Sequence, residues 1–175
     1  MKLLVMTEGT CELAMMNVLL ERNLLAFDEG ELLFRQMFQA RQIDEKLKEM
    51  INQLPANETV NIIRIGDKLS DKLKVPKGLS KRISNISSIC IKPEFEILHI
   101  IKENRFSEFI KLKSDIKASN YYMTINHEYK KTYKCNYNFF NQMDNGTLVE
   151  LFKNYDIKRK GTHSKTEKSI TILLR

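Results

Sequence analysis

The chain has 175 residues, of which 42% are hydrophobic, and it carries a net charge of +7. This length can bury a core, and no run approaches the ~20 apolar residues that a membrane-spanning helix needs. The N-terminal segment is too short for a secretory signal, and three scattered cysteines fit neither a disulfide framework nor a zinc site. We therefore expect a cytoplasmic, non-membrane protein with reduced thiols.

The first hundred residues alternate between strand and helix patterns. Short apolar runs bounded by turn residues indicate strands, and apolar residues spaced by three and four indicate helices. We expect strands at 3–6, 59–65 and 86–91, and helices at 11–25 (with Thr10 as N-cap), at 44–54 and from Pro93 to 104. Residues 27–41 are ambiguous, and 67–78 is expected to be a surface excursion. The alternation predicts an α/β fold, a three-layer core with a mainly parallel sheet.

The charge is unevenly divided along the chain. Residues 1–99 contain 14 basic and 14 acidic side chains, whereas residues 100–175 contain 15 and 8 and include all six tyrosines. We therefore divide the chain into an α/β core, 1–104, and a basic, tyrosine-rich, mainly helical extension, 105–175, packed on that core, with a weak apolar segment near its end. Such a charge division suggests chemistry in one part and contact with a polyanion in the other, although for charge alone a solvated lysine surface is the favoured explanation.

Acidic residues follow the predicted strands. Glu8 comes after the first strand, Asp67 after the second, and Glu94 and Glu96 after the third. Because ligands of parallel sheets bind outside the carboxyl ends of strands, these acids are candidate ligands for Mg²⁺ or Mn²⁺. The structural alternative is that helix dipoles favour Glu12 and Glu94 near helix N-termini and that Asp67 belongs to an ordinary turn.

Two segments resemble a known family. EGTCE at 8–12 resembles the glutamate-glycine motif that opens TOPRIM domains, nearest to RloB-like and OLD-family nucleases, and IKPEFEILHII at 91–101 is similar to a segment of RloB-like proteins. The resemblance implies a TOPRIM-like fold and metal-dependent cleavage of nucleic acid, often in phage defence, with Glu8 and Glu96 at the first and last acidic positions. The middle motif departs from the family. Asp67 matches its first aspartate, Leu69 stands in place of the second, and Asp71 comes two residues late.

The extension interleaves aromatic and basic side chains, as a groove for single-stranded nucleic acid does. If helical, Tyr129, Tyr133 and Tyr137 form one stripe, which alternatively packs on the core. The candidate nucleic-acid contacts are Tyr129, Lys130, Lys131, Tyr133, Lys134, Lys158, Arg159 and Lys160. Two further residues have expected roles: His99 is structural, and Cys11 lies at a helix start that can lower a thiol pKa. His127 is either a surface residue or a proton shuttle.

These features favour Mg²⁺- or Mn²⁺-dependent hydrolysis of phosphodiester bonds in DNA or RNA. Glu8, Asp67 and Glu96 are the expected catalytic and metal-binding residues, and Asp71 is a further metal ligand. Either Asp71 or Glu12 would assist. The alternative is a catalytically inactive TOPRIM-like protein that binds nucleic acid or another protein as a regulator or as a defence or counter-defence component. A third interpretation is that the domain works with a partner ATPase.

Overall fold

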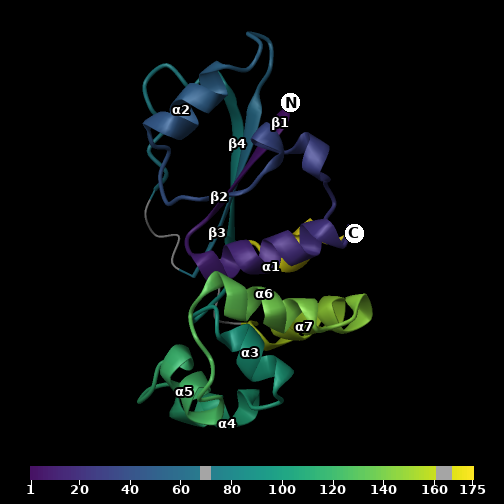
Figure 1. Ribbon diagram of the computed structural model, residues 1–175. Helices are drawn as coiled ribbons and strands as arrows, with labels where there is room; N and C mark the ends of the chain where they lie inside the picture. Colours follow the sequence, from purple (N-terminus) through teal and green to yellow (C-terminus); the bar gives the residue numbers. More distant parts are fainter. Residues whose placement is uncertain (68–71, 161–166) are drawn as a thin grey trace.

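The computed structural model describes residues 1–67, 72–160 and 167–175. Its centre is a four-stranded sheet in the order β2-β1-β3-β4, in which every neighbouring pair is parallel (Figure 1). The strands are β1 (Lys2–Thr7), β2 (Phe38–Gln39), β3 (Val60–Gly66) and β4 (Ile83–Cys90). The predicted α/β fold with a parallel sheet followed by helices is therefore confirmed.

The two faces of the sheet bury different apolar clusters. Side chains alternate along a strand, so Leu4 and Met6 of β1 face one cluster, together with Leu47 and Ile51 of α2 (Glu45–Asn52). Val5 faces the other cluster, which contains the buried side of α1 (Thr10–Glu21). The sheet thus forms the middle of a layered α/β core.

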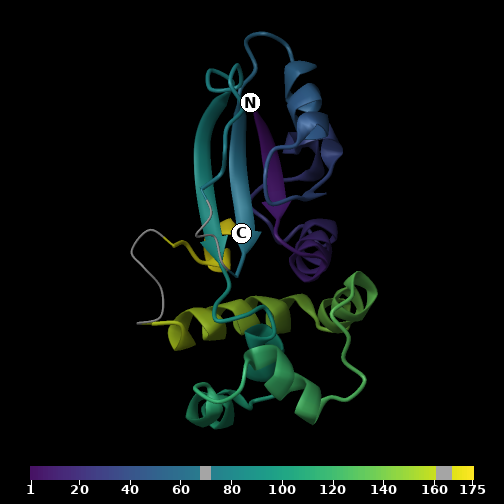
Figure 2. The same cartoon turned by 90° about the vertical axis from the view of Figure 1, so that its left-hand side faces the viewer.

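The helices between residues 97 and 158 lie beyond the carboxyl ends of the strands, as Figures 1 and 2 both show. Helix α6 packs against α1, and the larger apolar cluster continues from the sheet into these helices without interruption. The helices are α3 (Ile97–Lys102), α4 (Phe106–Leu112), α5 (Ala118–Ile125), α6 (Tyr133–Asn141) and α7 (Asn145–Lys158). They therefore stand over the sheet edge at which a parallel sheet binds ligands.

Several predicted element boundaries are wrong. Helix α1 ends at Glu21 rather than at residue 25, because Asn23 has a left-handed φ of 54°. Its N-cap is Gly9, and Thr10 is the first helical residue. Pro93 does not begin a helix, since α3 starts at Ile97 with Glu96 as its N-cap.

The ambiguous segment 27–41 contains two short 3-10 helices, η1 (Glu29–Glu31) and η2 (Leu33–Arg35), followed by β2. The apolar C-terminal segment is also a 3-10 helix, η3 (Ile170–Leu173), which is flanked by isolated bridges to Ile89 and Leu25. Among the described residues, no helix has both the length and the apolar character that crossing a membrane requires.

Candidate acidic site at the carboxyl edge of the sheet

Glu8 leaves the end of β1 and is held against two neighbouring strands. Its backbone N–H donates to the carbonyl of Ile65 in β3 at 2.8 Å. Its carboxylate, which is 16% exposed, accepts from the guanidinium of Arg41 at 3.1 Å, and that guanidinium is largely in solvent. Arg41 follows β2, where the next backbone contact is from Ala40 N–H to the carbonyl of Thr7. The short strand β2 therefore positions the cation that neutralises Glu8.

Glu12 lies in the first turn of α1 and is only 6% exposed. Burial raises the pKa of its carboxyl from 4.5 to about 7, with its own backbone N–H acting in the opposite direction and the negative charges of Asp67, Glu8 and Glu96 raising it further. Three acids therefore lie close enough to Glu12 for their negative charges to raise its pKa: Glu8 after β1, Asp67 after β3 and Glu96 at the residue before the next helix.

Gly9 provides the space that Glu12 needs. A Cβ placed at Gly9 would lie 2.8 Å from Oε2 of Glu12, closer than carbon and oxygen approach. The backbone of Gly9 is extended, with φ of −132° and ψ of 175°, a conformation open to any residue. The glycine of the glutamate-glycine pair therefore makes room for a carboxyl and does not serve a special backbone angle.

Glu96 is almost completely buried, at 1% exposure. Its Oε1 accepts from the hydroxyl of Tyr129 at 2.9 Å and from Nζ of Lys131 at 3.0 Å. Burial lowers the pKa of Lys131, but the hydrogen bond and the charge of Glu96 outweigh it and hold that pKa above its ordinary value. The other oxygen, Oε2, is buried without a hydrogen-bond partner among the described residues.

The remaining acids have different positions. Asp67 follows β3, is partly buried and contributes to the raised pKa of Glu12. Asp71, the expected additional ligand, lies outside the described residues. Glu94 has a structural role, because its Oε2 accepts from the backbone N–H of Ser119 at 2.8 Å and thereby caps the start of α5.

The donor chemistry of this edge fits a hard divalent cation, since the oxygens are all from carboxylates and Oε2 of Glu96 is buried without a hydrogen-bond partner among the described residues. In the part of the chain that the structure describes, however, no three acidic, histidine or cysteine side chains converge closely enough to hold an ion. Instead, Arg41 forms an ion pair with Glu8, and Lys131 forms one with Glu96. Metal binding at this edge therefore requires these carboxylates to turn away from their protein cations.

A buried polar chain lies behind the acidic edge and joins α1 to α3 and α6. Nε2 of His99 donates to Oδ1 of Asn136 at 2.8 Å, and Nδ2 of Asn136 donates to Sγ of Cys11 at 3.2 Å. Burial lowers the pKa of His99 to about 4, and burial together with nearby Glu12 raises the pKa of Cys11 to about 12. The helix start could lower the pKa of Cys11, but burial raises it instead. His99 is an uncharged core residue, as expected.

The predicted tyrosine stripe is broken. Tyr129 lies in the segment before α6, is 6% exposed and hydrogen-bonds Glu96, so its ring is not open to a base. Tyr133 and Tyr137 do share a face of α6 and stack with ring centroids 5.8 Å apart. The hydroxyl of Tyr133 accepts from Asn17 of α1 at 2.8 Å. These two tyrosines therefore attach α6 to α1.

The predicted basic contacts fall in separate places. Lys131 reaches the acidic edge, and Lys130 and Lys134 are exposed nearby in sequence. Lys158 and Arg159 lie at the end of α7 and line a different cavity, while Lys160 is exposed. His127 is exposed as well.

Sequence reasoning missed three residues that shape the acidic edge: Arg41, Tyr129 in its role as a donor to Glu96, and Asn136. The apolar pair at 37–38, followed three residues later by Arg41, is the available sequence signal for a strand with a cation at its end. Strand β2 has only two residues, however, which is too short to show a periodicity. Tyr129 and Asn136 reach their partners through the tertiary packing of the extension on the core. No local sequence pattern predicts these contacts.

Comparison with known proteins gives no match: no family model, no curated protein and no solved structure matches the chain.

Proposed function

We propose that the protein is a TOPRIM-like nuclease that hydrolyses phosphodiester bonds of DNA or RNA with Mg²⁺ or Mn²⁺. The observation that carries the proposal is the environment of Glu12, whose buried carboxyl has a pKa of about 7 and is acted on by Asp67, Glu8 and Glu96. Acids from distant parts of the chain repel one another at this edge, and such an arrangement is typical of functional sites. The basic extension supports nucleic acid as the substrate.

Each residue has a chemical task in this proposal. Glu8, Asp67 and Glu96 would hold the ion, which when bound lowers the pKa of a water and stabilises negative charge on a phosphodiester. Glu12 changes protonation near neutral pH and can accept the proton of the attacking water. Lys131 is 47% exposed, so its ammonium can leave the ion pair with Glu96 and bind a substrate phosphate instead.

A second candidate function rests on the ion pairs of the same edge. Arg41 neutralises Glu8, and Lys131 neutralises Glu96, so these two acids have charge partners without any metal. This observation favours a TOPRIM-like protein that has lost catalysis and binds nucleic acid or a protein partner through its basic extension.

A cleavage assay separates the two functions. Labelled single-stranded and duplex DNA and RNA are incubated with Mg²⁺ or Mn²⁺ and with wild type, Glu8→Gln or Glu150→Gln. The matched control Glu150 is an exposed glutamate of α7. We expect wild type and Glu150→Gln to cleave at the same rate and Glu8→Gln to lose at least ~100-fold, within the range seen for removal of one catalytic group. Equal cleavage by Glu8→Gln would remove Glu8 from the mechanism. Binding of all substrates without cleavage by wild type would support the inactive binding protein.

A further inference from the structure

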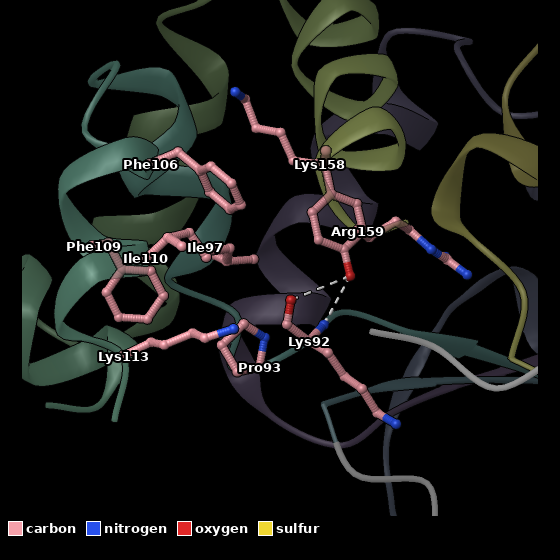
Figure 3. A pocket seen from close by; sticks show the side chains of 10 residues that line it. Lys92, Pro93, Ile97, Phe106, Phe109, Ile110, Lys113, Lys158 and Arg159 are labelled. Atoms are coloured by element: carbon pink, nitrogen blue, oxygen red, sulfur yellow. Dashed lines mark hydrogen bonds between the residues drawn. The ribbon is translucent and has the colours of Figure 1, made fainter. Parts of the chain in front are cut away.

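A separate cavity lies between the end of β4, helices α3 and α4, and the end of α7 (Figure 3). It encloses about 220 Å³, and apolar side chains form most of its wall. Tyr155 anchors one side, because its hydroxyl accepts from the backbone N–H of Lys92 at 2.8 Å. The lining residues are Lys92, Pro93, Ile97, Phe106, Phe109, Ile110, Lys113, Tyr155, Lys158 and Arg159. None of the acids used in the proposed function lines it.

The lining is strongly basic, with four cations and no acid among the described residues that form it. Lys92 pairs with Glu167, and Arg159 lies 3.7 Å from Asp156. Lys113 and Lys158, in contrast, form no ion pair with another described residue. Two lysines of the lining therefore carry positive charge that no described acid compensates.

The size and shape of the cavity indicate what it can accept. A cavity of about 150 Å³ already takes a benzene ring, and drug-sized ligands occupy about 300–1,000 Å³. The intermediate volume therefore suits one planar ring system, with the rest of the ligand left at the rim. The ammonium of Lys158 lies 4.8 Å from the ring centroid of Phe106, so a ring and a cation already meet at the mouth.

We propose that this cavity binds a nucleoside phosphate, with the base against the apolar wall and the phosphate held at the rim by Lys113 or by Lys158, which Figure 3 shows on different sides of the cavity. The charge complementarity between a phosphate and an ammonium group that no described acid pairs with favours this class over an uncharged ring. The ligand is either a free nucleotide or the terminal nucleotide of a strand, since both carry the same chemistry. This proposal goes beyond nuclease activity and does not depend on the acidic edge.

The first test blocks the cavity. Ile110 lines it and is 38% exposed, whereas Leu112, on the same helix and 44% exposed, does not line it. Ile110→Trp fills the mouth, and Leu112→Trp is the matched control. Adenosine monophosphate is titrated into each protein by calorimetry. We expect wild type and Leu112→Trp to bind within twofold of each other and Ile110→Trp to bind at least tenfold more weakly. Equal affinity in all three, or no binding to wild type, would overturn the proposal.

The second test removes charge and keeps the chain length. Lys113→Gln/Lys158→Gln is compared with Lys111→Gln/Lys153→Gln, whose lysines are exposed on the same two helices and do not line the cavity. We expect at least a tenfold loss of affinity for adenosine monophosphate in the first double variant and less than twofold in the second. An equal loss in both would show non-specific attraction and overturn the proposal.

The ligands themselves complete the design. Adenosine and inorganic phosphate are each expected to bind at least tenfold more weakly than adenosine monophosphate, and decanoate, an anionic chain without a ring, likewise. If any of the three matches the nucleotide, the assigned chemistry is wrong. A 5′-phosphorylated tetranucleotide that binds more tightly than the mononucleotide identifies a strand end as the ligand. The reverse order identifies a free nucleotide, and either order supports the shared chemistry.

Discussion

Replacing Glu12 by glutamine tests the electrostatics of the acidic edge most simply. Burial raises the pKa of this carboxyl from 4.5 to about 7, so the folded protein holds the proton more tightly than the unfolded chain does. The unfolded state releases its proton first, and the free energy of unfolding contributed by this group therefore falls as the pH rises from 4.5 to 7. At about 1.4 kcal/mol per pKa unit, the carboxylate destabilises the fold by about 3 kcal/mol above pH 7.

Glutamine keeps the shape of the side chain and removes the ionisation. We expect Glu12→Gln and wild type to have similar stability at pH 4.5, and the variant to be more stable by about 3 kcal/mol at pH 8. Urea denaturation followed by circular dichroism across this range measures the difference. Glu150→Gln, an exposed substitution on α7, is the control and should follow wild type at every pH.

The comparison isolates Glu12 from other titrating groups. His99 acts in the opposite direction, because its pKa is lowered to about 4 and its contribution to stability is lost as the pH falls from 6.5. That contribution is present in both proteins and cancels in their difference. A stability difference between Glu12→Gln and wild type that does not change with pH would refute the reasoning.

Three further predictions concern the same region. Gly9→Ala would place a Cβ 2.8 Å from Oε2 of Glu12 and push the carboxyl outward. The pKa of Glu12, measured by NMR titration, should then fall from about 7 towards 4.5. An unchanged pKa would contradict the spatial role of the glycine. Tyr129→Phe removes a donor to buried Glu96 and should lower the free energy of unfolding by about 1–3 kcal/mol in urea, whereas an unchanged value would exclude a stabilising hydrogen bond. His99→Gln removes the loss of stability that His99 contributes between pH 6.5 and 4, so the stability of the variant relative to wild type, measured by thermal unfolding, should rise as the pH falls through this range, and a difference that does not change with pH would contradict the assignment.

The sheet was predictable because its signals are local. The apolar runs before Glu8 and Asp67 show where β1 and β3 end, and strand–helix alternation is typical of a parallel sheet. Strand β4 was also identified, although it begins at Ile83, three residues before its apolar run. Strand β2 was not identified, because two residues cannot display a period of two.

The acidic edge was only partly predictable. Placing Glu8, Asp67, Glu94 and Glu96 after strands follows from topology alone, and the resemblance matched Glu8 and Glu96 to the acidic positions of a family. The sequence favoured a dipole explanation for Glu12, whereas its environment depends on burial under the helical layer. The same layer carries Tyr129 and Lys131 onto Glu96, a contact across more than thirty residues that no local pattern reveals. Burial also raises the pKa of Cys11, although its position at a helix start could have lowered it.

The central claim is that acids from separate segments form one site for a divalent cation. Calorimetric titration of Mn²⁺ at pH 7, in two buffers with different ionisation enthalpies, tests it without a substrate. We expect wild type to bind one ion and to release protons, because a cation at this edge would deprotonate Glu12. Glu8→Gln should weaken binding at least tenfold, and Glu150→Gln should leave it unchanged. No binding to wild type, or equal binding by Glu8→Gln, would contradict the account.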